Sequence, residues 1–280
     1  MGTKETSLGA STLLEYPAYL DHIRRDSRRF REVLTDCDPA TPVPGCPDWT
    51  AADLLWHLTE VQSFWAQTVR SRPAAPPQEG PGPARPTAYA DLLATFDERS
   101  AALVDELAAA DPRDPAWHWA PEQTVGTSYR RQAHEALIHR LDAEQTAGAV
   151  TPLDPVLAAD GVHEALDVMY GGKPPAWGRF EPGPHHVRLD LVDQGTSIWA
   201  RPGSFHGTDP ESGRRYDDPH LQVVPAPDAP PAAVISGRAA DVDAWLWHRL
   251  GEHVVGPVLK VTGDRAAYDA LLTAVSESVD

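Results

Sequence analysis

Two acid–base side chains four residues apart, Glu135 and His139, are the strongest chemical feature of the sequence. They lie within residues 130–144, which contain no Pro or Gly and are rich in the good helix formers Ala, Leu, Glu and Arg. On a helix, residues four apart stand one above the other, with Cβ atoms about 5–6 Å apart. This spacing lets a carboxylate and an imidazole bind one metal ion, although surface ion pairs use it as well.

Two more ionisable residues share the same helical stripe. Arg131 is four residues before Glu135, and Asp142 is seven after it. Asp142 either hydrogen-bonds a metal-bound His139 and fixes its tautomer, or pairs with a neighbouring Arg. Arg131 either neutralises a carboxylate of a substrate or cofactor, or forms a salt bridge with Glu135. His134 lies about 100° round the helix from Glu135, so we expect it to pack rather than to bind metal.

A third candidate ligand, His57, lies in a separate helical segment. Apolar residues recur at helical spacing from Leu54 to Trp65, and His57 falls within that apolar stripe. A buried imidazole needs a polar partner, which is a metal ion, a backbone carbonyl or a water molecule. A catalytic zinc site has three protein ligands and one open position, so His57 would complete a site with Glu135 and His139.

Four motifs follow one another along the chain: Pro-Gly-Cys-Pro-Asp-Trp-Thr at 44–50, Leu-x-x-His-Leu at 54–58, Trp-x-Trp at 117–119, and Arg-Arg-x-Ala-His-Glu-x-x-x-His-Arg-x-Asp at 130–142. Together they resemble the mycothiol-dependent maleylpyruvate isomerases, which belong to the DinB-like metalloenzyme superfamily of four-helix bundles. The resemblance covers residues 14–148 and extends more weakly into a C-terminal domain. It implies that His57, Glu135 and His139 bind a divalent metal, usually zinc, and that mycothiol is the thiol co-substrate.

One further residue, Arg249, receives a role from the resemblance. Arg249 lies in a stretch similar to a Leu-Trp-x-x-Arg segment of the family's second domain, where a helical Arg reaches towards the active site. His248 departs from the small residue usual before that Arg. Trp117 either lines the mouth of the pocket and contacts the cofactor or packs at the end of the bundle, as does Trp119.

Composition limits the partners of the protein. The formal charge of −17 over 280 residues argues against nucleic acid and against an anionic membrane surface. Cys37 and Cys46 are too few for a disulfide framework, and we expect structural thiols. No signal-peptide-like or membrane-spanning apolar run is present, so we expect a cytoplasmic protein. The expected partners are a small-molecule substrate and a thiol, and the expected state is a monomer or small homo-oligomer.

Helix and strand signals predict an α+β chain with a four-helix bundle at residues 1–150 and a smaller α+β domain at 151–280. The resemblance implies a sterol-carrier-like fold for the second domain. Residues 71–86 are rich in Pro and Gly and predict a long loop, often a lid or a wall of a site. Helices are expected near 13–34, 50–70, 87–109, 127–147, 155–170, 239–250 and 264–276, and strands near 186–192, 196–201, 216–224, 233–236 and 258–261.

A His₂Glu metal site leaves positions open for chemistry. Zinc binds a thiol and lowers its pKa, which creates a nucleophile at neutral pH. Addition to an activated double bond, rotation and thiol expulsion give cis–trans isomerisation, whereas stopping after addition gives a conjugate. The alternatives are a thiol-independent biosynthetic metalloenzyme, which mycothiol would not stabilise, and a non-catalytic metal-binding regulatory module, which would have no open coordination position.

Overall fold

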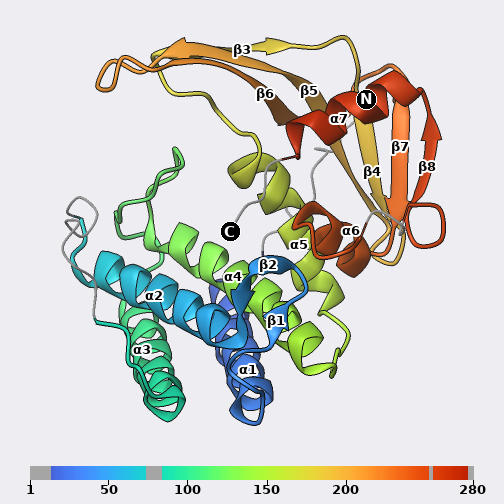
Figure 1. Ribbon diagram of the computed structural model, residues 1–280. Coiled ribbons are helices and arrows are strands. Elements are labelled where there is room, and N and C mark those ends of the chain that lie inside the picture. Colours follow the sequence, from blue (N-terminus) through green and yellow to red (C-terminus); the bar gives the residue numbers. More distant parts are fainter. Residues whose placement is uncertain (1–13, 74–83, 252–254, 277–280) are drawn as a thin grey trace, which may run out of the picture. The chain divides into compact units, whose positions relative to one another are not determined.

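The computed structural model describes residues 14–73, 84–251 and 255–276, which form two compact units (Figure 1). The first unit is Leu14–Leu153, and the second begins at Asp154. Residues 74–83, the centre of the expected lid loop, lie outside the described residues. No helix in the described part of the chain is long and apolar enough to cross a membrane.

The first unit is a bundle of four helices, as the sequence predicts. Helix α4 contacts both α1 and α2, and α2 also packs against α3. Nearly every side chain of α4 up to Glu144 is buried, including its ionisable ones, so its charges must be balanced by side chains inside the bundle. The four helices are α1 (Tyr16–Thr35), α2 (Ala51–Arg70), α3 (Tyr89–Ala109) and α4 (Val125–Ala147).

Local signals set the ends of the two helices that carry the candidate ligands. Thr50 and Asp53 form a capping box at the start of α2, with reciprocal bonds between side chains and backbone. Thr124 caps α4 by accepting a hydrogen bond from the backbone N–H of Thr127. Gly148 ends α4 with φ of 66°, a left-handed conformation that glycine adopts without steric penalty.

A small hairpin precedes α2, where the sequence indicated only an irregular connection. Strands β1 (Pro42–Val43) and β2 (Cys46–Thr50) pair antiparallel. The sequence did not predict these strands, because they are too short to show an alternating pattern and the segment contains Pro and Gly. Cys46 is buried in β2 and Cys37 is half-buried, and neither is in a disulfide bond.

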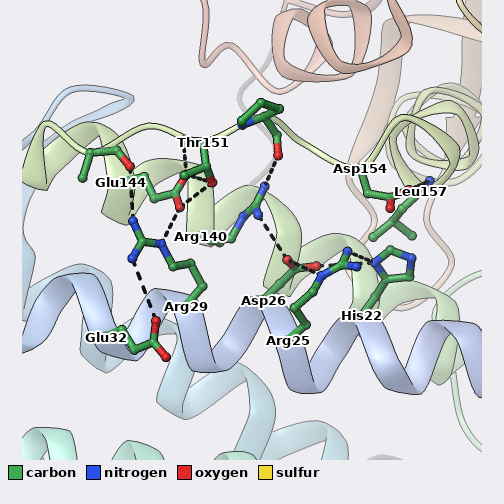
Figure 2. Close-up of polar contacts among 12 residues, drawn as sticks. His22, Arg25, Asp26, Arg29, Glu32, Arg140, Glu144, Thr151, Asp154 and Leu157 are labelled. Carbon is green, nitrogen blue, oxygen red and sulfur yellow. Dashed lines mark hydrogen bonds and ion pairs between the residues drawn. The ribbon is translucent and has the colours of Figure 1, made fainter.

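Buried and partly buried ion pairs link α4 to α1, and Glu144 of α4 also bonds to the chain that follows the helix (Figure 2). Arg140 Nη1 lies 3.4 Å from Asp26 Oδ1, and Arg29 Nε lies 2.8 Å from Glu144 Oε1. Glu144 also accepts hydrogen bonds from the backbone N–H and hydroxyl of Thr151, at 2.8 and 2.7 Å. These contacts join α4 to α1 and to the segment that follows α4.

The second unit is a mixed six-stranded sheet with helices against its apolar face. Strand order is β3-β5-β4-β7-β8, with β6 pairing β5, and only β4 and β7 run parallel. Alternate residues of β4 are buried, as a half-buried strand requires. The elements are α5 (Pro155–Glu164), the π-helix η1 (Ala165–Met169), β3 (Gly178–Pro182), β4 (Val187–Leu191), β5 (Thr196–Thr208), β6 (Arg215–Val224), β7 (Ala233–Gly237), α6 (Ala239–Leu246), β8 (Lys260–Gly263) and α7 (Arg265–Ala274).

The α+β class is confirmed, but the second unit differs from the expected elements in three places. Strand β3 was missed, because its Gly and Pro are poor strand formers, and β5 extends to Thr208 by pairing with β3 and β6. The helix expected at 239–250 ends at Leu246. His248 has a left-handed φ of 59°, which stops the helix, so Arg249 follows α6 rather than projecting from it.

Candidate metal centre

Helices α2 and α4 bring the three expected metal ligands together. His57 lies on α2, and Glu135 and His139 lie one turn apart on α4. One ligand atom from each residue lies within 4.8 Å of the other two. The imidazole rings of His57 and His139 meet edge to face, with centroids 4.8 Å apart. Glu135 and His139 are buried, whereas His57 is half-buried and not the fully core-facing residue that the stripe indicated.

The donor set fits a metal ion. His139 Nε2 and Glu135 Oε2 are 3.1 Å apart, but neither buried atom makes a hydrogen bond to any described residue. Two ligands of a tetrahedral zinc ion, each about 2.0–2.1 Å from the metal, are about 3.3 Å apart. The two atoms are therefore spaced like two ligands of one metal ion, without the orientation of a hydrogen-bond donor and acceptor.

Asp142 supports His139 from the far side of the ring. Its Oδ2 lies 3.0 Å from His139 Nδ1, and both side chains are fully buried. Burial alone would lower the pKa of His139, but the Asp142 hydrogen bond and the Glu135 carboxylate raise it to about 9. The contact favours a proton on Nδ1 and leaves Nε2 directed at Glu135 and His57, the usual arrangement around a metal-bound histidine.

Arg131 balances the charge of Glu135. Its Nη2 lies 3.2 Å from Glu135 Oε1, so the expected alternative of an internal salt bridge is present. Burial opposes ionisation of Glu135, but the positive charge of Arg131 and the nearby His139 lower its pKa to about 2. Glu135 is therefore a carboxylate at neutral pH, the form that binds a metal ion.

Trp49 is a residue of the centre that the sequence did not single out. Its ring lies 4.6 Å from that of His57 and 6.3 Å from that of His139, measured between centroids. It comes from β2, directly before the capping residue Thr50 of α2. The sequence feature that could have identified Trp49 is its place in the Cys-Pro-Asp-Trp-Thr motif. It lies four residues before Asp53, and Asp53 lies four residues before His57.

Other candidates lie apart from the three ligands. His134 is fully buried, and its ring meets Tyr19 of α1 edge to face at 6.4 Å, as expected for a packing residue. Trp117 packs with Phe64 and Trp65 of α2, with centroids 5.8 and 6.2 Å away. Trp117 therefore packs at the end of the bundle, which is one of the two roles expected for it. Its contact with a cofactor stays a prediction.

Arg249 belongs to the second unit. Its side chain is 5% exposed, and its Nη1 donates a 2.6 Å hydrogen bond to the backbone oxygen of Trp247. A buried guanidinium retains its charge, so it suits recognition of a carboxylate. Its role beside the metal stays a prediction.

Comparison with known proteins agrees with this architecture. Residues 20–144 match the family model described as the mycothiol maleylpyruvate isomerase N-terminal domain. Two crystal structures of the mycothiol-dependent maleylpyruvate isomerase, one of them a histidine-to-alanine mutant, are similar to the chain at TM-scores of 0.54 and 0.56. Each is 13% identical and covers 89% of this chain and 93% of its own, which establishes a shared fold. No curated protein matches the sequence.

Proposed function

Residues 20–144 belong to the mycothiol maleylpyruvate isomerase N-terminal domain family, and from this we propose that the chain is a metal-dependent, thiol-using enzyme. It would use a low-molecular-weight thiol, mycothiol, for cis–trans isomerisation or thiol transfer on a small carboxylate-bearing substrate. The observation that carries the proposal is the group formed by His57, Glu135 and His139, whose ligand atoms lie within 4.8 Å of one another. Three protein ligands are the number found in catalytic zinc sites.

Zinc held there would lower the pKa of a thiol and provide a nucleophilic thiolate at neutral pH. The chain's own residues would prepare the site. Glu135 supplies negative charge and is kept ionised by Arg131. Asp142 would accept a hydrogen bond from His139 Nδ1–H and so hold the ring in place. Trp49 lies next to both imidazoles and would limit access of water.

The reaction class follows from what a thiolate does to an activated double bond. Addition of the sulfur converts the double bond into a single bond, which rotates, and loss of the sulfur restores the double bond in the other configuration. No net atom is gained or lost. If the adduct is released instead, the product is a thiol conjugate. Two arginines, Arg131 and Arg249, are the candidates for attracting a substrate carboxylate to a chain of charge −17.

Metal content and thiol binding test the proposal. Purified protein should hold about one zinc per chain, and His139→Ala should lose it. Mycothiol should then raise the melting temperature of zinc-loaded wild type and leave zinc-free protein unchanged. Conversion of maleylpyruvate would establish the isomerase reaction. Undiminished zinc in His139→Ala would reject the site.

The same measurements separate the alternative functions. Bound zinc without any mycothiol effect would favour a thiol-independent metalloenzyme of the same fold. Zinc that no small ligand can contact, because all its coordination positions come from protein, would favour a regulatory metal-binding module.

A further inference from the structure

The indole ring of Trp49 lies beside both imidazoles of the candidate metal centre. Its centroid is 4.6 Å from that of His57, with 40° between the ring planes, and 6.3 Å from that of His139, with 34° between the planes. The two imidazoles are themselves 4.8 Å apart and meet at 72°. The three rings are therefore mutual neighbours, although only the imidazoles offer a nitrogen that can bind a metal ion.

The backbone around Trp49 is held in place without any contribution from a metal. Trp49 lies in β2, and the next residue, Thr50, pairs with Pro42 of β1 and caps α2. The backbone N–H of Ala51 donates a 2.8 Å hydrogen bond to the oxygen of Thr41, which ties the start of α2 to the hairpin. The hairpin and the capping box thus position the indole relative to the helix that carries His57.

The two histidines are supported in different ways. His139 is fully buried, and its Nδ1 lies 3.0 Å from Asp142 Oδ2. His57 comes from α2 and is half-buried. An imidazole on a rotatable side chain can adopt several rotamers, and packing of its ring against an indole restricts that choice. Trp49 restricts His57 by packing, much as Asp142 restricts His139 by a polar contact.

The interaction of the indole with the imidazoles also depends on whether a metal is bound. A divalent ion on an imidazole nitrogen draws electron density out of the ring and makes the ring more positive. The face of an indole is negative and attracts positive groups within about 6 Å of its centroid. The Trp49–His57 contact is therefore stronger with metal than without it, and by linkage this difference increases the affinity for the metal.

We propose that Trp49 is a positioning residue that raises the affinity of the centre for zinc, through its packing against His57 and His139. Trp49 itself binds neither the ion nor the thiol. The inference rests on the metal site of the proposed function, and it holds whether or not that site uses a thiol.

Zinc affinity of the full chain, measured by competition with a chelator of known affinity, is the first test. Trp49→Leu keeps an apolar side chain but removes the ring, and it should weaken zinc about tenfold or more while one site per chain remains. Trp49→Phe keeps a smaller ring with a weaker negative face, so its affinity should lie between those of wild type and Trp49→Leu.

Trp119→Leu is the matched control for the loss of a tryptophan. Trp119 is 49% exposed, and its ring contacts in the described part of the chain are with Trp65, Trp117 and His118, none of them a candidate ligand. Its zinc affinity should equal that of wild type. Thermal unfolding of the zinc-free proteins shows which variants fold.

Cobalt gives a second readout that packing of the bundle alone would not change. Bound Co²⁺ quenches the fluorescence of an indole close to it, and the chain contains nine tryptophans. Loading wild type and Trp119→Phe with Co²⁺ should quench a part of the emission that Trp49→Phe lacks. This comparison also decides the question if Trp49→Leu does not fold.

A folded Trp49→Leu variant that binds zinc as tightly as wild type would overturn the proposal, as would cobalt quenching that is unchanged in Trp49→Phe. The wild-type sample keeps this failure separate from failure of the proposed function. Wild type and Trp119→Leu that both bind no zinc would reject the metal centre and this inference with it. Zinc bound equally well by wild type and Trp49→Leu would reject only the role of Trp49.

Discussion

Asp142 Oδ2 lies 3.0 Å from His139 Nδ1, three residues apart on α4, and neither side chain is exposed. The carboxylate thus decides which nitrogen of a candidate metal ligand stays free. Because Nδ1 is engaged with Asp142, Nε2 is the atom left to face Glu135 and His57. A residue that does not touch the ion would in this way control how well the ion binds.

Replacing Asp142 by Asn should weaken zinc about 10- to 100-fold while one zinc site per chain remains. The amide keeps the size of the side chain but loses the charge that favours the required tautomer. Competition with a chelator of known affinity measures the effect. If Asp142→Asn bound zinc as tightly as wild type, Asp142 would have only a packing role.

His134→Ala should keep zinc at wild-type stoichiometry, although it is adjacent to Glu135 in sequence. Its ring points to Tyr19 of α1, so its loss removes packing inside the bundle and no ligand. Metal analysis and a thermal unfolding curve check both parts. Loss of zinc here would mean that α4 is rotated relative to the structure.

The buried pairs between α1 and α4 should matter for folding (Figure 2). Asp26 is fully buried and lies 3.4 Å from Arg140, 3.6 Å from Arg25 and 3.6 Å from His22. Asp26→Ala would leave Arg140 buried beside an empty position, and should lower the free energy of unfolding by about 3–5 kcal/mol. Urea unfolding measures it.

The double variant Asp26→Leu with Arg140→Met is the matched comparison for the ion pair. It removes both charges and fills the space with apolar groups, so it should be more stable than Asp26→Ala. Equal instability of the two variants would show that the lost volume, and not the unpaired charge, dominates.

The Thr50–Asp53 capping box should make stability depend on acidity. Hydrogen bonds from Thr50, and then the Arg85 guanidinium, lower the pKa of Asp53 from 3.8 to about 2, against the opposing effect of burial. Because the folded-state pKa is the lower one, the ionised form stabilises the fold above pH 4, and this contribution is lost as the pH falls from about 4 to 2.

Asp53→Asn should therefore destabilise zinc-free protein near neutral pH by about 0.5–1 kcal/mol, since the side chain is partly exposed to solvent. The difference from wild type should shrink as the pH approaches 2. Urea unfolding at several pH values checks it, and a difference that stays constant with pH would contradict the assignment to Asp53.

Arg249→Ala should bind zinc normally but lose turnover or ligand affinity worth about 2–5 kcal/mol, if Arg249 binds a buried carboxylate. The exposed Arg265, which pairs with Asp269 on α7, is the matched control, and Arg265→Ala should behave like wild type. Steady-state kinetics and zinc analysis of both variants test whether Arg249 binds the ligand. Unchanged kinetics in Arg249→Ala would mean that Arg249 has only a structural role in the second unit.

The sequence determined the bundle and the candidate ligands because these depend on local rules. Helical periodicity and end signals such as Thr50 and Gly148 operate over a few residues, so they can be recognised without tertiary contacts. The four-residue spacing of Glu135 and His139 is likewise fixed once the segment is helical. His57 was found from its place in an apolar stripe and from the resemblance.

Tertiary structure decided what the spacing left open. It placed Arg131 within ion-pair distance of Glu135, and it placed Trp49 against His57 through a hairpin too short to recognise from the sequence. These outcomes depend on residues that are distant in sequence or on backbone turns, such as the left-handed His248 that ends α6 before Arg249. Local helix and strand propensities cannot predict such contacts, because these contacts form only once the helices and strands have packed.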